Sequence, residues 1–122
     1  MFDHVGLKVR DLAASIDFYR RTLAPLGLEL GSQGEGYAGF GPPGAPALWL
    51  YAHAGGAGAG THLAFRAPSQ SAVQGFHAAG LAAGGRDNGG PGPRPDYAAD
   101  YYAAFLIDPD GHNVEAVCHC SA

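Results

Sequence analysis

The segment FDHVGLKVRDLAASIDFYRRTL, residues 2–23, joins a half-buried strand to an amphipathic helix. Apolar and polar residues alternate from position 4 to 9, as they do in a strand with one face in a core. Asp11 then offers a side chain that can accept hydrogen bonds from the first turn of a helix. The apolar residues that follow recur on one helix face: Leu12, Ile16, Tyr19 and Leu23.

A second copy of this pattern follows at a shift of 58 positions, which takes His4 to His62. THLAFRA, residues 61–67, alternates in the same way, and Ser69 takes the place of Asp11 before a helix expected from about residue 69 to 83. A repeat of this length predicts two copies of one structural unit. Other matched positions share their character: Val5 with Leu63, Leu7 with Phe65, Phe18 with Phe76, and Gly27 with Gly85.

Three further strands are predicted after each helix, so both halves have the order β-α-β-β-β. The predicted class is α+β, with two tandem modules in a single domain over residues 1–122. Module one is expected at about 1–53 and module two at about 61–120, with a Gly/Ala linker at 54–60. The predicted later strands lie at 28–30, 37–40, 47–53, 86–88, 101–107 and 113–118.

Composition limits the partners. A formal charge of −4, with seven Lys and Arg residues spread along the chain, offers no basic surface for nucleic acid or an anionic membrane. The apolar stretches are too short to span a membrane. Cys118 and Cys120 lie side by side on a predicted strand and are expected to stay unpaired, which favours a reducing compartment. We therefore expect a soluble cytoplasmic protein.

Two histidines hold equivalent places in the repeat. Alternation points His4 and His62 away from the strand faces that pack under the helices, and it points Glu115 on the last predicted strand the same way. Taken singly, each side chain also fits an ordinary surface role. If the sheets curve around one cavity, however, the three converge. Two imidazoles and a carboxylate can bind one divalent ion and leave positions for a chelating substrate.

Further residues are candidates for a substrate pocket. Trp49 and Tyr51 share the cavity side of their strand and suit an aromatic or apolar ligand, although packing at a sheet edge or dimer interface explains them equally well. Arg66 could pair with an anionic group of a substrate or form an ordinary surface ion pair. Tyr101 borders a long loop at 89–101, which is either a lid or a plain surface loop.

Three segments resemble the signatures of the vicinal oxygen chelate superfamily, which includes glyoxalase I, bleomycin resistance proteins, extradiol dioxygenases and fosfomycin resistance thiol transferases. The resemblance implies that the paired modules form an open, cup-shaped mixed sheet with helices outside, the glyoxalase/bleomycin resistance/dioxygenase fold. It also implies a homodimer, because in many small members two chains complete the sites. The segments are DHVGLKVRDLAASIDFYRRTL (3–23), THLAFRA (61–67) and AFLIDPDGHNVEAV (104–117).

The resemblance further implies a metal site, with Glu115 as both ligand and expected catalytic base. Glyoxalase I has a fourth ligand, a Glu, at the place of Trp49, so a four-ligand site is not expected. A Trp there is similar to the fosfomycin transferases, but Ala103 and Phe105 replace the expected Ser and Tyr, so fosfomycin is not a predicted substrate and Phe105 becomes a pocket candidate. The implied ligands of one divalent ion (Fe, Mn, Ni, Co or Zn) are His4, His62 and Glu115.

Two functions follow from this resemblance. The first is a metal-dependent enzyme of lyase, dioxygenase or thiol transferase type, acting on a small substrate that chelates the ion through vicinal oxygens. The alternative is a metal-free protein that sequesters an aromatic small molecule, as bleomycin resistance proteins do. Such binders are not expected to keep all three ligands, so the ligand set favours the enzyme. His77 and His112 are expected on a helix surface and in a turn, outside the site.

Overall fold

The computed structural model describes residues 1–55, 58 and 60–120. Each half of the chain has the predicted order β-α-β-β-β, and the second half adds the short strand β7 within its long loop. The division into domains remains a prediction, and part of the expected linker, at 56–57 and 59, lies outside the described residues. The first half contains β1 (Val5–Val9), α1 (Leu12–Leu23), the 3-10 turn η1 (Ala24–Leu26), β2 (Glu29–Gly34), β3 (Tyr37–Gly41) and β4 (Leu48–Ala52). The second contains β5 (His62–Arg66), α2 (Gln70–Ala82), β6 (Arg86–Asp87), β7 (Gly92–Pro93), β8 (Tyr101–Ile107) and β9 (Asn113–His119).

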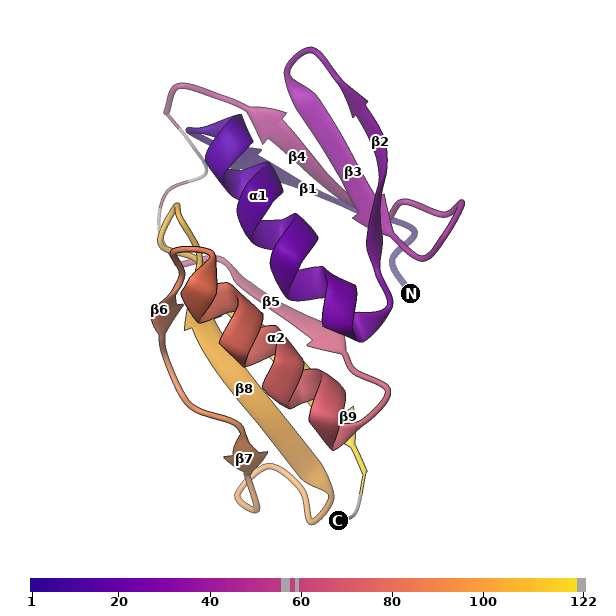
Figure 1. Cartoon of the computed structure of the whole chain (residues 1–122), viewed down its shortest axis with the longest axis vertical. Coiled ribbons are helices and arrows are strands. Elements are labelled where there is room, and N and C mark those ends of the chain that lie inside the picture. The colour runs from indigo at the N-terminus through magenta and orange to yellow at the C-terminus, as the bar shows by residue number, and fades with distance from the viewer. Residues whose placement is uncertain (56–57, 59, 121–122) are drawn as a thin grey trace.

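The strands form two mixed sheets of matching topology. The first has the order β1-β4-β3-β2 and the second β5-β9-β8-β6, with β7 pairing separately with β8. In both, the first strand of the module runs parallel to the last, and the remaining pairs are antiparallel. Each helix covers one face of its own sheet, and the two helices pack side by side (Figure 1). The fold is therefore the predicted α+β arrangement of two repeated modules.

The buried residues confirm the faces predicted from alternation. Leu7 and Val9 of β1 are buried, whereas Gly6 and Lys8 between and beside them are exposed. Both helix starts are also as predicted: Asp11 accepts a hydrogen bond from Ala14 N, and Ser69 accepts one from Ala72 N, each at 3.1 Å. These caps satisfy backbone donors that the first turn of a helix leaves free.

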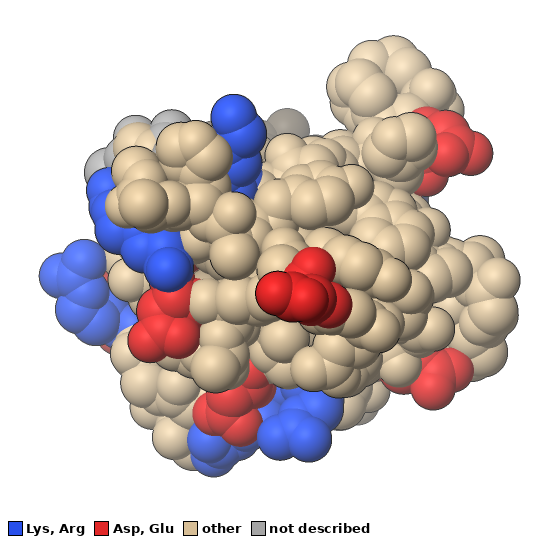
Figure 2. All heavy atoms as spheres, turned by 90° about the horizontal axis from the view of Figure 1, so that it is seen from above, with Lys and Arg blue, Asp and Glu red and all other residues tan. Residues whose placement is uncertain are grey.

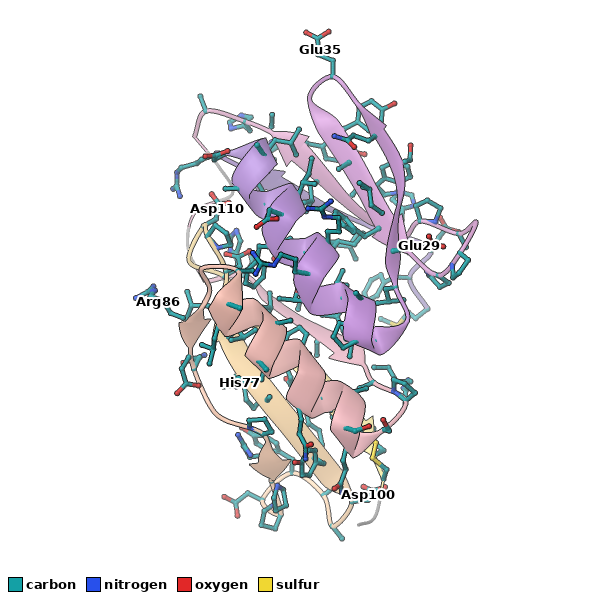
Figure 3. All side chains as sticks on the ribbon, viewed as in Figure 1. Glu29, Glu35, His77, Arg86, Asp100 and Asp110 are labelled. Atoms are coloured by element: carbon teal, nitrogen blue, oxygen red, sulfur yellow. A yellow bond between two sulfur atoms is a disulfide. The ribbon has the colours of Figure 1, made fainter. Side chains whose placement is uncertain are left out.

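The turn between β8 and β9 ties the second module to α1. Tyr19 on α1 donates its hydroxyl to Asp108 Oδ2 at 2.5 Å. Asp110 lies beside α1 (Figure 3), where its Oδ1 accepts from Arg10 N at 3.1 Å and its Oδ2 accepts from Ser15 Oγ at 3.4 Å. Both carboxylates are almost fully buried, so these partners replace the water that the charges lose. The turn therefore fixes how the modules meet.

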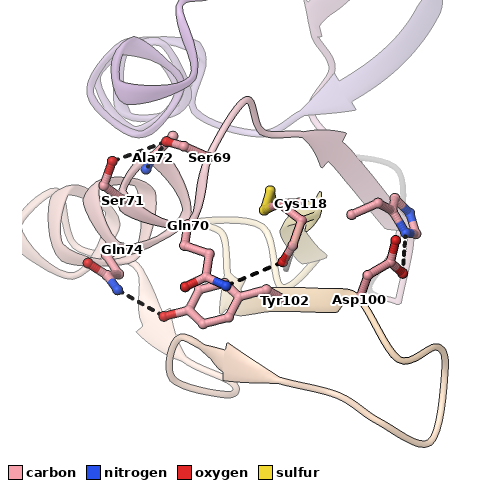
Figure 4. The surroundings of a disulfide bond; sticks show 10 residues. Ser69, Gln70, Ser71, Ala72, Gln74, Asp100, Tyr102 and Cys118 are labelled. Carbon is pink, nitrogen blue, oxygen red and sulfur yellow. Dashed lines mark hydrogen bonds and ion pairs between the residues drawn. A yellow bond between two sulfur atoms is a disulfide. The ribbon is translucent and has the colours of Figure 1, made fainter. Parts of the chain in front are cut away.

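The expectation of two unpaired cysteines is wrong. Cys118 and Cys120 form a disulfide (Figure 4), because Cys120 follows the end of β9 and the chain brings the two Cα atoms to 5.3 Å, within disulfide range. The argument for a reducing compartment thereby loses its basis, and cytoplasmic location stays a prediction. His112 lies in the connection between β8 and β9, as expected, and is fully buried there. No helix in the described chain is long and apolar enough to cross a membrane.

Candidate functional site

His62 and Glu115 are brought together by the parallel pairing of β5 with β9. The register sets His62 opposite Asn113 and Ala64 opposite Glu115. The side chains of His62 and Glu115 therefore lie on the same sheet face, offset by two residues along the paired strands. Nε2 of His62 lies 3.1 Å from Oε1 of Glu115. The carboxylate is only 2% exposed, whereas the imidazole is open to solvent. The pair therefore presents a buried anion behind an accessible ring nitrogen.

The contact of Nδ1, the other ring nitrogen of His62, bears on which group can lie between Nε2 of His62 and Oε1 of Glu115. Nδ1 is 3.0 Å from the backbone oxygen of Asn113. A carbonyl oxygen can only accept, so Nδ1 carries a hydrogen; Nε2 then either donates to Oε1 from a ring that carries both hydrogens or, without one, turns its lone pair toward Oε1. Two acceptors at this distance require a cation between them, either a proton or a metal ion. A carbonyl that fixes the tautomer in this way is the usual partner of a metal-binding histidine, so these residues fit a divalent ion.

Tyr101 holds the second oxygen of the same carboxylate. It lies on β8, adjacent to β9, and its hydroxyl donates to Oε2 of Glu115. Burial first, and then the hydrogen bond to Glu115, raises the pKa of Tyr101 to about 12, so the phenol keeps its proton at ordinary pH. Because Oε2 is occupied in this way, Oε1 is the oxygen left for His62 or for an ion.

The remaining second-module candidates surround this pair. Phe105 stacks beside the His62 ring, with centroids 6.5 Å apart and planes 20° from parallel. The guanidinium of Arg94 lies 5.4 Å from the centre of the Phe105 ring and donates to the carbonyl oxygens of Gly90 and Gly92. The long loop is therefore folded against this wall of the site. Arg66 is exposed, and among the described residues no carboxylate pairs with it.

His4 lies elsewhere in the chain. Its Nδ1 is 2.7 Å from Oδ1 of the neighbouring Asp3, and the side chain is exposed. In Figure 1, β1 starts beside the N-terminus on the right, and β5 starts on the left. Within residues 1–55, 58 and 60–120, no three His, Cys, Asp or Glu side chains gather as metal ligands. One chain thus brings two of the three predicted ligands together, and the three-ligand site remains a prediction.

Trp49 and Tyr51 lie on the same sheet face as Gly6 and Lys8 of β1, the strand that follows His4. The parallel register sets Trp49 opposite Gly6 and Tyr51 opposite Lys8. Tyr37 of β3, which the sequence analysis omitted, lies opposite Tyr51, and its ring centre is 6.3 Å from that of Trp49. Alternation does not mark it, because the four residues that follow Tyr37 in β3 are all buried.

Two other features lie outside this region. A groove of about 500 Å³ runs between Leu12 and Ile16 of α1 and Leu30 of β2, on the helix side of the first sheet. Charged residues are mixed on the face seen from above (Figure 2), where acidic side chains lie among the Lys and Arg side chains.

Known proteins resemble the chain along nearly its whole length. The model of the glyoxalase/bleomycin resistance protein/dioxygenase superfamily matches residues 1–116. The crystal structure of a glyoxalase/bleomycin resistance protein from Albidiferax ferrireducens T118 is 33% identical, with a TM-score of 0.85 over 97% of this chain and 98% of that one. A putative glyoxalase from Bacillus halodurans is 25% identical, with a TM-score of 0.71 over 97% of this chain and 95% of that one. No curated protein matches.

Proposed function

The chain belongs to the glyoxalase/bleomycin resistance protein/dioxygenase superfamily, and from this we propose that it is a divalent-metal-dependent enzyme. Its substrate is a small molecule that chelates the ion through vicinal oxygens, in a reaction of lyase, dioxygenase or thiol transferase type. The observation that carries the proposal is the approach of His62 Nε2 to Glu115 Oε1 at 3.1 Å, because one divalent ion can take both atoms as ligands while the backbone oxygen of Asn113 holds Nδ1.

The ion, when bound, supplies a Lewis acid that stabilises negative charge developing on the substrate oxygens. His62 and Glu115 would hold it through Nε2 and Oε1. Tyr101 keeps the carboxylate in place through Oε2. Glu115 is also the proposed base: since the Tyr101 hydroxyl occupies Oε2, Oε1 would receive the substrate proton while it is not bound to the ion.

A second copy of the chain completes the site in this proposal. His4 stands apart from His62 within one chain, and its exposed ring is free to reach a partner. An exposed apolar side chain just before β1 also favours an interface: Phe2 is 76% exposed. Burying such apolar surface favours association. Each site of the homodimer then takes His4 from one chain and His62 with Glu115 from the other.

Elemental analysis tests the metal. Protein is purified without chelator or affinity tag and compared with His62→Ala and with His77→Ala, whose ring instead pairs with Asp87 at 2.9 Å. We expect about one transition-metal ion per chain in the wild type and in His77→Ala, and loss of the ion in His62→Ala. No metal and no uptake of added ions by folded protein would overturn the proposal.

The second candidate function is a metal-free protein that sequesters an aromatic small molecule. The observation that favours it is the exposure of Tyr37 and Tyr51 beside Trp49 on an open sheet face. For such a binder, His62→Ala leaves ligand affinity unchanged, whereas for the metalloenzyme the same variant loses both the metal and the chelating ligand.

A further inference from the structure

Three aromatic side chains on the helix-free face of the first sheet lie over glycines of neighbouring strands. A Cβ atom built on Gly39 would lie 2.6 Å from Cζ3 of Trp49, and one built on Gly6 would lie 3.1 Å from Cε2 of Tyr51. A Cβ on Gly34 would meet the ring of Tyr37. At Gly39 and Gly34 the ring therefore occupies the space of a missing side chain, and at Gly6 a side chain would leave only a tight contact.

The three rings form one surface, here called the aromatic floor (Tyr37, Trp49 and Tyr51). Strand register sets Tyr37 opposite Tyr51, and the Tyr37 and Trp49 ring centres are 6.3 Å apart. Tyr37 is 37% exposed and Tyr51 is 44% exposed, so the rings cover the sheet without being covered themselves. A contiguous exposed aromatic surface of this kind is typical of a binding site.

A free cation stands at the border of this floor. Lys8 lies opposite Tyr51 in the parallel pairing of β1 with β4, on the same sheet face. It is exposed, and within the described chain no carboxylate pairs with it and no side chain accepts its hydrogen bonds. An unpaired ammonium beside apolar rings complements a ligand with a negative group at the edge of an apolar plane.

We propose that the aromatic floor takes a planar aromatic carboxylate, with the ring against Trp49 and Tyr51 and the carboxylate on Lys8. The inference rests on the second candidate function above, a protein that sequesters an aromatic small molecule on this sheet face, and it names the class of that molecule. Aromatic rings attract one another beyond simple burial, which favours a planar ring over an aliphatic chain of equal size. Lys8 then selects the acid over its neutral amide.

Fluorescence provides the test, because Trp49 is the single tryptophan of the chain. Folded protein is titrated with benzoate, with its neutral analogue benzamide and with acetate, in the presence of a chelator. We expect saturable quenching by benzoate, binding of benzamide that is weaker by about tenfold, and no response to acetate. Because the chelator removes metal, the result is independent of whether the metal proposal holds.

Three variants make the test specific. Lys8→Gln is expected to weaken benzoate binding by about tenfold and to leave benzamide unchanged. Gly39→Val displaces the Trp49 ring and is expected to weaken both ligands, with circular dichroism to check that the chain is folded. Arg86→Gln removes an equal charge from an outward side chain on β6 of the other sheet (Figure 3) and is expected to change nothing. Equal affinity for benzoate and benzamide, or no saturable response, would overturn the inference.

Discussion

The carboxylate of Glu115 is held from two sides at once. Tyr101 donates to Oε2, and His62 approaches Oε1 with its tautomer fixed by a backbone oxygen. A buried carboxylate costs free energy unless such partners replace its water, so its orientation is strongly determined. The Tyr101 hydroxyl thus acts through Glu115, as a positioning group for whatever cation lies at Oε1.

Removing that hydroxyl is therefore expected to loosen the site. Tyr101→Phe keeps the ring but leaves Oε2 without its donor, and we expect metal affinity to fall by about 10-fold to 100-fold. Competition against a chromophoric chelator measures the affinity. Tyr97→Phe is the matched control, since Tyr97 contacts the Tyr101 ring edge-on at 5.1 Å and is 66% exposed. Equal affinities in both variants would mean that Tyr101 does not position Glu115.

Strand alternation predicted that His62 and Glu115 face the same side, and pairing of the first and last strands brings them into contact. The role of Tyr101 was not predictable in this way, because the sequence does not show that its hydroxyl reaches across from β8 to Glu115. The contact of His4 with Asp3 is local and depends on a rotamer. Patterns of period two specify faces, whereas side-chain contacts depend on packing.

At the scale of elements, the two helices begin as their sequences predict. Asp11 caps α1 through a hydrogen bond to Ala14 N. Asp11→Ala is expected to lower the free energy of unfolding by about 1 kcal/mol, because it leaves that backbone donor without its partner. Asp17→Ala on the same helix removes an exposed carboxylate that pairs with Arg21 at 3.2 Å, and we expect a change below about 0.5 kcal/mol. Urea denaturation followed by circular dichroism compares them; an equal loss in both would contradict a capping role.

Strand boundaries were less predictable than helix starts. The strand predicted at 28–30 extends as β2 to Gly34, because backbone pairing with β3 continues through a polar stretch that carries no alternation. The extra strand β7 consists of Gly92 and Pro93, which have low strand propensity, and it exists only through pairing with β8. In both cases the strand is defined by pairing with a neighbouring strand, and the sequence of one segment does not reveal that partner.

At the scale of the whole molecule, Tyr19 connects the modules through Asp108. Burial first, and then the charge of Asp108, raises the pKa of Tyr19 well above 10. In the unfolded chain the phenol ionises near pH 10, so above that pH the folded state holds a proton that the unfolded state has lost. Stability is therefore expected to fall as the pH rises above about 10, by up to about 1.4 kcal/mol per pH unit for this group.

Denaturation of the wild type and Tyr19→Phe at pH 8 and at higher pH isolates this contribution. The variant is expected to be less stable at pH 8, because it lacks the hydrogen bond to Asp108, and to lose stability less steeply above pH 10. Parallel curves for the two proteins would show that Tyr19 does not titrate with unfolding.

The arrangement of the repeat explains why His4 and His62 are separated. The two modules carry the same sequence pattern, but they meet through α1 and α2, so β1 and β5 start on opposite sides of the molecule (Figure 1). The repeat predicted which strand face each histidine occupies. It did not reveal whether the two histidines of one site come from one chain or from two. That choice depends on contacts between modules, and in the proposed homodimer on contacts between chains.

A mixed dimer tests the shared site directly. One chain carries His4→Ala, the other carries both His62→Ala and Glu115→Ala, and separable non-metal-binding tags isolate the heterodimer. If each site combines His4 of one chain with His62 and Glu115 of the other, one site receives every substitution and the second receives none. Elemental analysis is therefore expected to find about half the wild-type metal in the heterodimer and little in either homodimer. Full metal in the His4→Ala homodimer would exclude His4 as a ligand, and a metal-free heterodimer would exclude the exchange of ligands between chains.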